Sequence, residues 1–377
     1  MTNDVKNVPE WRFAGFVDEW EKKLLNEIAN VQMGQSPNSK NYTDDSQEMI
    51  LVQGNADLKN GKVFPRVFTK EITKLANIGD ILLSVRAPVG EIGISQMPVC
   101  IGRGVCSITS NLFIYYFLDY FNNENKWKKF SQGSTFESIS GNEVRSLIIY
   151  SPSKTEQQKI GDFFSKLDRQ IELEEQKLEK LEEQKKGYMQ QIFSQKICFK
   201  DDNGNDYPEW ESKKFLDIFK LAPSKNNQIK SSEVVENGII PVVDQGKDIF
   251  LGYSNEKDKA IEDFNNVIVY GDHTTIIKYI KEPFIIGGDG VKLLESNDGS
   301  LIHYLYILLQ YFNVKPEGYK RHYSILKNKM MNISNTKEEQ EKIGNFFTKF
   351  DELIEKQSSK IGVLKQRKKG FLQKMFV

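Results

Sequence analysis

Residues 155–193 read TEQQKIGDFFSKLDRQIELEEQKLEKLEEQKKGYMQQIF and contain no proline. Apolar side chains recur along this stretch in alternating steps of four and three positions, with Glu and Lys in most places between them. A period of about 3.5 residues predicts one long helix with a single apolar seam, which is buried only against a partner helix. The apolar seam positions are Ile160, Phe164, Leu167, Ile171, Leu178, Leu181, Tyr188 and Ile192.

A second copy of this helix lies in the same chain. Residues 339–376 repeat residues 156–193 at a constant offset of 183 positions, and 18 of the 38 aligned pairs are identical. A single such helix would be interpreted as a solvated surface helix. Two matched copies indicate an internal duplication, in which each helix buries its apolar face against the other. The apolar positions of the second seam are Ile343, Phe347, Phe350, Ile354, Ile361, Leu364, Phe371 and Met375.

Both helices carry the same start signal. Ser153 stands three positions before Glu156, and Thr336 stands three positions before Glu339. This spacing is typical of a capping box, in which the side chains of the cap and of the third helical residue bond to each other's backbone N–H groups. We therefore expect one helix over 155–193 and another over 337–377.

Polar residues interrupt the two seams at equivalent positions, Glu174 with Gln357 and Lys185 with Lys368. Long side chains that extend out of a loosely packed seam are the simpler interpretation. The alternative is control of helix register. In that case, replacing both lysines with Leu should raise the melting temperature but permit other pairings.

Composition limits the class of protein. The 377 residues have a formal net charge of zero, so an anionic partner must be met by local patches of charge. Three cysteines without a CxxC motif are typical of a reduced, cytoplasmic protein. The polar start MTNDVKNVPEW is no signal peptide, and the apolar stretches are too short and too polar for a membrane span.

The chain divides into four parts: a globular region at 1–154, the helix at 155–193, a second globular region at 194–336, and the helix at 337–377. Each globular region also has an aromatic stretch, 112–122 and 302–313, interpreted as a core helix rather than a base-stacking surface. The expected fold class is α+β, with two mainly β regions. Runs typical of strands are 49–52, 80–85, 91–94, 239–243, 267–270, 284–286 and 291–294.

The order of these parts predicts the geometry of the helix pair. The second globular region starts a few residues after the first helix ends, and the termini of compact domains usually lie close together. The second helix should therefore start near the far end of the first and run back along it. This predicts an antiparallel coiled coil with an internal pseudo-two-fold repeat.

The chain resembles the specificity subunit of type I restriction–modification systems. The resemblance rests on the two EQxKIGxFF…KKG(Y/F) helices, on PEWRFAGFVDEWEKKLLNEI at 9–28, and on segments 79–93 and 133–140. It implies two target-recognition domains, each reading one half of a bipartite double-stranded DNA site. It also implies partners: methyltransferase subunits, two per chain, docked on the helices, together with restriction/translocase subunits.

Local basic and polar clusters agree with contacts to DNA phosphates and base edges. Each cluster taken alone would be interpreted as a solvated surface loop. The candidates in the first region are Lys62, Arg66, Arg86, Arg103, Lys126, Lys128, Lys129, Gln132 and Ser134. Those in the second region are Lys225, Asn226, Asn227, Lys230, His273, Lys320, Arg321 and His322.

No motif for catalysis or cofactor binding is found. The chain lacks a Gly-x-Gly nucleotide signature, an Asn-Pro-Pro-aromatic motif and a Walker lysine loop, and its three histidines show no metal-ligand spacing. We therefore expect a non-catalytic subunit without a metal or cofactor. Two alternatives remain: a coiled-coil adaptor that binds only proteins, and an enzyme with an unrecognised hydrolase site.

Overall fold

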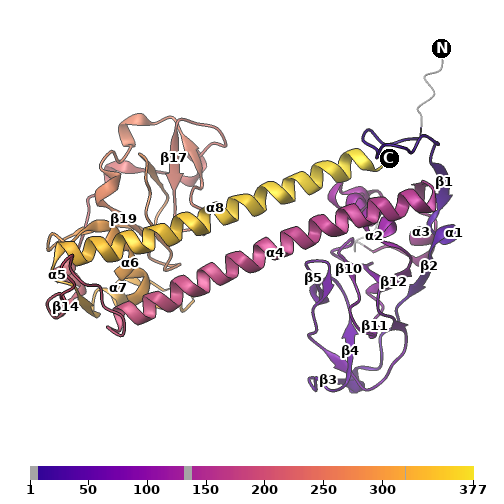
Figure 1. Cartoon of the computed structure of the whole chain (residues 1–377), viewed down its shortest axis with the longest axis horizontal. Helices are drawn as coiled ribbons and strands as arrows, with labels where there is room; N and C mark the ends of the chain where they lie inside the picture. Colours follow the sequence, from indigo (N-terminus) through magenta and orange to yellow (C-terminus); the bar gives the residue numbers. More distant parts are fainter. Residues whose placement is uncertain (1–6, 131–137, 319) are drawn as a thin grey trace, which may run out of the picture. The chain divides into compact units, whose positions relative to one another are not determined.

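The computed structural model of the chain describes residues 7–130, 138–318 and 320–377 (Figure 1). Two compact units make up this structure. The first unit contains the chain up to Glu175 together with Ser359–Val377, and the second unit contains Gln176–Ser358. Each unit therefore combines one globular part with a stretch of each long helix.

The long helices are α4 (Lys154–Phe193) and α8 (Lys337–Met375). Inside the first unit, Asp168 of α4 pairs with Lys368 of α8 at 2.7 Å, and Glu175 pairs with Lys365 at 2.7 Å. Residue numbers therefore rise along one helix as they fall along the other. The second unit repeats the pattern, because Lys185 pairs with Asp351 while Phe193 stacks on Phe347. The predicted antiparallel pairing is confirmed.

Three sheets form the globular part of the first unit: a six-stranded sheet in the order β2-β12-β9-β10-β6-β5, a five-stranded sheet in the order β3-β7-β4-β11-β8, and the pair β1-β13. All four residues of β9 are buried, because this strand lies inside its sheet. The strands are β1 (Glu21–Leu24), β2 (Asn30–Met33), β3 (Tyr42–Thr43), β4 (Met49–Val52), β5 (Leu58–Lys59), β6 (Lys62–Val63), β7 (Phe68–Thr69), β8 (Leu75–Ala76), β9 (Ile81–Ser84), β10 (Ile92–Ile94), β11 (Val99–Ile101), β12 (Val105–Thr109) and β13 (Ile148–Ser151).

The second unit has two four-stranded sheets, β15-β22-β19-β20 and β16-β21-β17-β18, and the pair β14-β23. Its strands are β14 (Glu211–Lys214), β15 (Phe219–Leu221), β16 (Gln228–Ile229), β17 (Ile240–Val243), β18 (Gly252–Ser254), β19 (Ile268–Gly271), β20 (Ile277–Lys278), β21 (Ile285–Gly287), β22 (Val291–Ser296) and β23 (Met330–Ile333).

The two globular parts share one topology although their sequences do not align by eye. The order β2-β12-β9-β10 in the first unit corresponds to β15-β22-β19-β20 in the second, and β1-β13 corresponds to β14-β23. Both units also place a parallel pair in the second sheet, β4 with β11 and β17 with β21. The hairpin β5–β6 is an addition at the sheet edge of the first unit. The duplication seen in the helices therefore extends to the globular parts.

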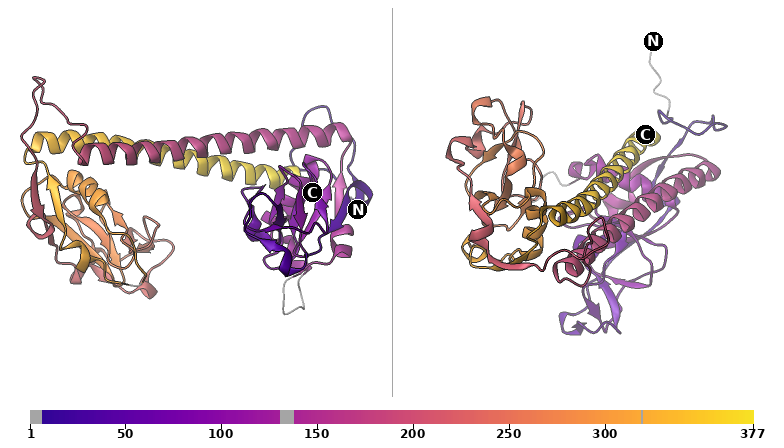
Figure 2. Two further views of the ribbon diagram at one scale, coloured as in Figure 1. Left: turned by 90° about the horizontal axis from the view of Figure 1, so that it is seen from below. Right: turned by 60° about the vertical axis from the view of Figure 1, so that its left-hand side comes forward.

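One aromatic helix lies in the core of each unit: α2 (Leu112–Asn123) and α6 (Ile302–Phe312). Seven residues of α2 are buried, which supports the interpretation as a core helix. The last turns of α8 enter the core of the first unit, where Phe376 stacks on Tyr120 at 5.6 Å (Figure 2). The short helices are α1 (Leu25–Ile28), α3 (Gly141–Arg145), α5 (Phe215–Ile218) and α7 (Tyr323–Leu326).

Glycines let α2 and α6 approach the long helices closely. A Cβ atom added at Gly161 would lie 2.8 Å from the Cβ of Leu112, and one added at Gly344 would collide with the imidazole of His303. Gly161 and Gly344 are equivalent residues of the duplication. The repeat thus keeps a glycine at the point where each long helix crosses its aromatic helix.

The predicted capping boxes are not formed. The Ser153 hydroxyl does accept the Glu156 N–H at 3.4 Å, but the Glu156 carboxylate takes two bonds from Arg12, at 2.6 and 2.7 Å. In the second unit, Glu339 accepts from the Trp210 indole at 2.9 Å and from Ser334 at 2.6 Å. Each glutamate therefore ties the start of a long helix to a distant segment instead of capping its own helix.

Candidate nucleic-acid interface

The seam residues differ in burial along the helix pair. Those that are fully buried are Ile160, Phe164, Ile171, Ile192, Ile343, Phe347, Ile361, Leu364 and Met375. Those that are half-buried are Leu167, Leu178, Leu181, Phe350, Ile354 and Phe371. Tyr188 is 40% exposed, yet its ring packs against Phe346 at 5.4 Å and Phe350 at 5.7 Å, so it lies at the exposed edge of the seam. The sequence pattern missed the buried Met189 and Leu372, because the helix ends pack on globular cores outside the seam.

Lys185 and Lys368 hold the two helices in register within their units. Lys368 lies 2.7 Å from Asp168 on the other helix and 2.8 Å from Asp119 on α2. Lys185 lies 2.6 Å from Asp351, the equivalent of Asp168 in the duplication. Burial alone would lower the pKa of Lys368, but the two carboxylates outweigh it and the pKa is raised. These ion pairs support register control over lysines that extend into solvent.

In the first unit, hydrogen bonds bring the loops that carry Arg86 and Arg103 together. The Val85 N–H donates to the carbonyl of Gly104 at 2.9 Å, so the loop after β9 lies beside the turn between β11 and β12. Both arginines are exposed. A hollow of about 490 Å³ opens beside Arg103, lined by residues 34–39 and Tyr42. This end of the unit presents hydrogen-bonding groups without an apolar cover.

The helical turn η3 (Lys126–Lys129) adjoins the same loop, because Gly90 lies against the Trp127 ring. Lys128 and Lys129 are exposed there. Lys126 is partly covered: its ammonium donates to the Tyr120 hydroxyl at 2.7 Å. Gln132 and Ser134 lie outside the described residues.

Two other candidates of the first unit are engaged elsewhere. Lys62 forms an ion pair with Glu172 on α4 at 2.6 Å, and Arg66 lies 3.9 Å from Asp57. Both side chains are about half exposed, at 53% and 49%. The structure therefore does not bring them into the cluster of Arg86 and Arg103.

In the second unit, the corresponding loops form a connected set of hydrogen bonds. The Nδ1 atom of His273 lies 3.1 Å from the Lys320 carbonyl oxygen, and its backbone N–H donates to Gln245 at 3.1 Å. Gln245 in turn donates to the Asp289 carbonyl at 3.4 Å, and Gln228 donates to the Asp289 carboxylate at 3.0 Å. Gln245 and Asp289 were missed in the sequence, where only a repeated Gly-x-Gly-Val, at 102–105 and 288–291, could have revealed them.

Lys278 positions the loop that carries Gln245. Its buried ammonium donates to the Asp244 carbonyl at 2.9 Å and to the Asp248 carbonyl at 2.5 Å. Desolvation lowers the pKa of this lysine, although Asp244 and Asp248 oppose the shift. The backbone around Gln245 is therefore held from beneath by a side chain that takes no part in the surface.

The remaining candidates of the second unit separate into two groups. Lys225, Asn226, Lys230 and Arg321 are exposed. The Asn227 amide instead donates to the carbonyls of Lys259 and Ala260, at 3.1 and 3.2 Å. Asn227 thus stabilises its own loop.

His322 is corrected as a candidate for DNA contact, because it is completely buried. Its Nε2 atom accepts the Glu317 N–H at 2.9 Å, so the proton resides on Nδ1, which lies 3.0 Å from the Asp272 carbonyl oxygen. Both ring nitrogens are therefore used to join two backbone segments. The histidine is a structural link between the loop after β19 and the start of α7.

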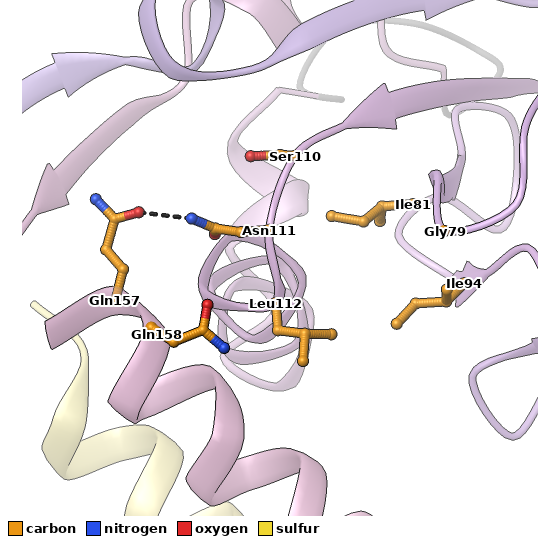
Figure 3. A pocket seen from close by; sticks show the side chains of 8 residues that line it. All are labelled: Gly79, Ile81, Ile94, Ser110, Asn111, Leu112, Gln157 and Gln158. Carbon is orange, nitrogen blue, oxygen red and sulfur yellow. Dashed lines mark hydrogen bonds between the residues drawn. The ribbon is translucent and has the colours of Figure 1, made fainter. Parts of the chain in front are cut away.

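A second hollow, of about 350 Å³, lies where α2 meets the start of α4 (Figure 3). Ile81, Ile94 and Leu112 line it on one side, and Asn111 donates to Gln157 across its rim at 2.8 Å. In the second unit Gln340, the equivalent of Gln157, accepts the Leu301 N–H at the start of α6. This hollow has no charged lining residue. It lies at the junction between the aromatic helix α2 and the long helix α4.

Among the residues the structure describes, no group of three or more His, Cys, Asp or Glu is placed to hold a metal ion. Within the same residues, no helix is long and apolar enough to cross a membrane.

Two β units of one topology, joined by a pair of long antiparallel helices and presenting polar loops, define a duplicated recognition scaffold. The family described as type I restriction modification DNA specificity domain matches the chain twice, over residues 17–183 and 207–365. The chain belongs to this family. The resemblance recognised in the sequence is confirmed.

Two curated relatives come from Methanocaldococcus jannaschii. The putative type I restriction enzyme MjaX specificity subunit is 33% identical over 191 residues, which cover 48% of this chain and 44% of that protein. The type I restriction enzyme MjaIX specificity subunit is 26% identical over 303 residues, 74% of this chain and 68% of that protein. The match to the first of these thus spans less than half of the relative's length.

A solved structure shows the same fold over the full length. The crystal structure of the type-I restriction–modification system S subunit from M. genitalium has a TM-score of 0.64 and covers 98% of this chain and 99% of that one. The two sequences are 17% identical. The fold predicted from the sequence, two β regions and two long antiparallel helices, is confirmed.

Proposed function

We propose that this chain is the sequence-specific DNA-binding subunit of a type I restriction–modification complex, and that each unit reads one half of a bipartite site. The observation that carries the proposal is that the two units share a topology but expose different loop residues. Arg86 and Arg103 stand in the first unit, where His273 and Asp289 stand in the second, because Val85 and Asp272 make the same backbone bond to the turn, with Gly104 and Gly290. Different side chains on one scaffold read different base edges, so the two half-sites are unlike.

The helices set the spacing between the half-sites. Their register is held in the first unit by Lys368 with Asp168 and in the second by Lys185 with Asp351. A fixed register keeps the length of non-specific DNA between the two half-sites constant. The centres of the half-sites should lie about one helical turn of DNA apart. Deleting whole helical turns from both helices should change this spacer and leave the bases of each half-site unchanged.

The chemistry is supplied by partners. Methyltransferase subunits, two per chain, would dock on the duplicated helices, and restriction/translocase subunits would complete the complex. Within the chain, the exposed Lys128, Lys129, Lys225, Lys230 and Arg321 would contact phosphates. Neutralising Lys128 and Lys129 together should weaken binding to all sequences and reduce its salt dependence.

Methylome sequencing of a host with and without the gene tests the proposal. A split, asymmetric methylated motif should vanish on deletion. Exchanging residues 211–333 for those of a relative should then change one half-site only. An uninterrupted palindromic motif, or a change in both half-sites after the exchange, would contradict reading of one half-site by each unit. An unchanged methylome would favour a protein-binding adaptor.

A further inference from the structure

One turn occupies the same place in both units. It joins the second sheet to the main sheet, between β11 and β12 in the first unit and between β21 and β22 in the second. Its sequence is Gly102-Arg103-Gly104-Val105 in one and Gly288-Asp289-Gly290-Val291 in the other. The middle residue therefore supplies the only side chain between the two glycines, a cation in one unit and an anion in the other.

Close packing leaves no room for a side chain at the second glycine of each turn. A Cβ atom at Gly104 would collide with the Gln53 carbonyl, and one at Gly290 would lie 2.7 Å from the Gln245 amide nitrogen. Gly288 and Gly290 also have positive φ angles of 87° and 88°, which other residues rarely adopt. These positions therefore require glycine, and the side chains of Arg103 and Asp289 project from the turn into solvent.

Both side chains stand among hydrogen-bonding groups rather than apolar ones. Beside Arg103 lies the polar hollow of about 490 Å³, and the Ser36 hydroxyl accepts the Arg103 backbone N–H at 3.1 Å. No hydrogen bond or ion pair of the Arg103 guanidinium occurs within the described part of the chain. Asp289 is flanked by Gln228, which holds its carboxylate at 3.0 Å, and by Gln245.

The charge of Asp289 limits what it can contact on DNA. A carboxylate is repelled by phosphates and accepts hydrogen bonds only, so within a DNA-binding surface it fits a base-edge amine. The cytosine N4 amine is the usual partner of Asp in the major groove, whereas Arg forms paired bonds with guanine O6 and N7. A turn used for phosphate contact would not carry an aspartate in one of its two copies.

From this geometry we infer that Arg103 and Asp289 are specificity-determining residues, and that each selects one base pair in the half-site of its own unit. Arg103 reads guanine and Asp289 reads cytosine. The inference rests on the proposed DNA-binding function and assigns it to one position per unit. Because glycines flank this residue in both turns, its side chain determines the base while the rest of the unit sets the frame.

Methylome sequencing of the host carrying single replacements in the full-length chain tests this inference. Arg103→Ala should relax one base pair of one half-site, with a loss of preference of roughly tenfold to a hundredfold. Arg103→Lys should keep guanine, because Lys also bonds its O6 and N7 atoms, and Arg103→Gln should shift the preference towards adenine. Asp289→Asn, which can still accept the Gln228 bond, should change one base pair of the other half-site only.

Lys23→Ala is the matched control, since it removes one positive charge from β1 of the first unit, and its motif should equal that of the wild type. The inference is overturned if Arg103→Gln and Asp289→Asn leave the motif unchanged, or if either variant alters several positions or both half-sites. If Arg103→Ala abolishes methylation altogether, the inference is tested by the other two variants. Arg103→Lys should keep guanine, and Arg103→Gln should shift the preference towards adenine. A wild-type chain without any split motif would instead contradict the proposed function itself.

Discussion

The two units use one frame but fix it with different contacts. In the first unit Glu156 is held by the Arg12 guanidinium, whereas in the second unit Glu339 is held by the Trp210 indole and the Ser334 hydroxyl. By contrast, the interhelical ion pair is the same in both, Lys368 with Asp168 and Lys185 with Asp351. Contacts between the helices are thus kept, while the contacts of these two glutamates with the globular parts have diverged.

The reason is geometric. A change in the interhelical pair would alter register along both helices, since both copies share one seam. A change where a helix meets its own globular part is absorbed inside that unit. Four measurements on the full chain test this difference between the two units.

The largest effect is expected at the helix starts. Replacing Arg12 with Met leaves the Glu156 carboxylate, 1% exposed, without its partner and should cost about 3–5 kcal/mol of unfolding free energy. Replacing Trp210 with Phe leaves Glu339 its bond to Ser334 and should cost only about 1–2 kcal/mol. Denaturant unfolding followed by circular dichroism measures both. Adding Glu156→Gln to Arg12→Met should restore part of the loss, and equal losses in the two units would refute the contrast.

A smaller effect is expected where the aromatic helices cross the long helices. Gly344→Ala drives a methyl group into His303 and should destabilise the chain by about 1–3 kcal/mol. Gly161→Ala should cost a similar amount, because the atom at 2.8 Å is the Leu112 Cβ, which a change of rotamer cannot move. Gly187→Ala in α4 and Gly370→Ala in α8 are the controls: no atom lies within 4 Å, so they should stabilise by up to about 1 kcal/mol. Thermal melts that rank all four substitutions alike would disprove tight packing at the crossings.

Replacing the seam lysines should give the next largest effect. The sequence predicted a higher melting temperature for the Leu variants, whereas the ion pairs of the structure predict a loss of stability. Lys368→Leu leaves Asp119 and Asp168 without a counter-charge and should lower the unfolding free energy by about 2 kcal/mol. Lys185→Leu removes the partner of one carboxylate, Asp351, which is 34% accessible to water, and a hydrogen bond to Gln310, and should cost about 1 kcal/mol. Because the pKa of Lys368 is raised in the folded chain, its contribution persists at neutral pH and is lost as the pH rises through that value. A higher melting temperature for either variant would show that the ion pairs are dispensable.

The smallest effect is a pH dependence confined to the second unit. Burial lowers the pKa of His303 below its ordinary value of 6.5, although Glu341 opposes the shift. As the pH falls through 6.5, the imidazole of His303 becomes protonated in the unfolded chain but stays neutral in the folded chain. Stability should therefore fall as the pH is lowered from 7.5 to 5.5. His303→Leu, which copies Leu112 of the first unit, should make the loss shallower. Identical pH profiles for variant and wild type would show that His303 titrates normally.

The sequence alone determined the helix pair. Its seams follow from a period that each helix expresses locally. The duplication at an offset of 183 residues indicated an intramolecular pair, and the order of the parts along the chain predicted its antiparallel direction. Several strands, among them β4 and β9, could also be predicted from the sequence. Short apolar runs that end at turn-forming residues are typical of buried strands. Patterns of this kind are set by residues close together in the sequence, so they do not depend on how distant segments pack.

Tertiary packing alone revealed the shared topology of the globular parts and sorted the candidate residues. Arg12 lies 144 positions from Glu156, and no local pattern announces that bond. His322 and Arg321 are neighbours in the sequence, yet one is buried and the other is exposed. Any surface lysine or histidine looks alike in a sequence, because burial and partners are set by segments that meet only when the chain folds. The grouping of Arg86 with Arg103, and of His273 with Asp289, came from such meetings between loops.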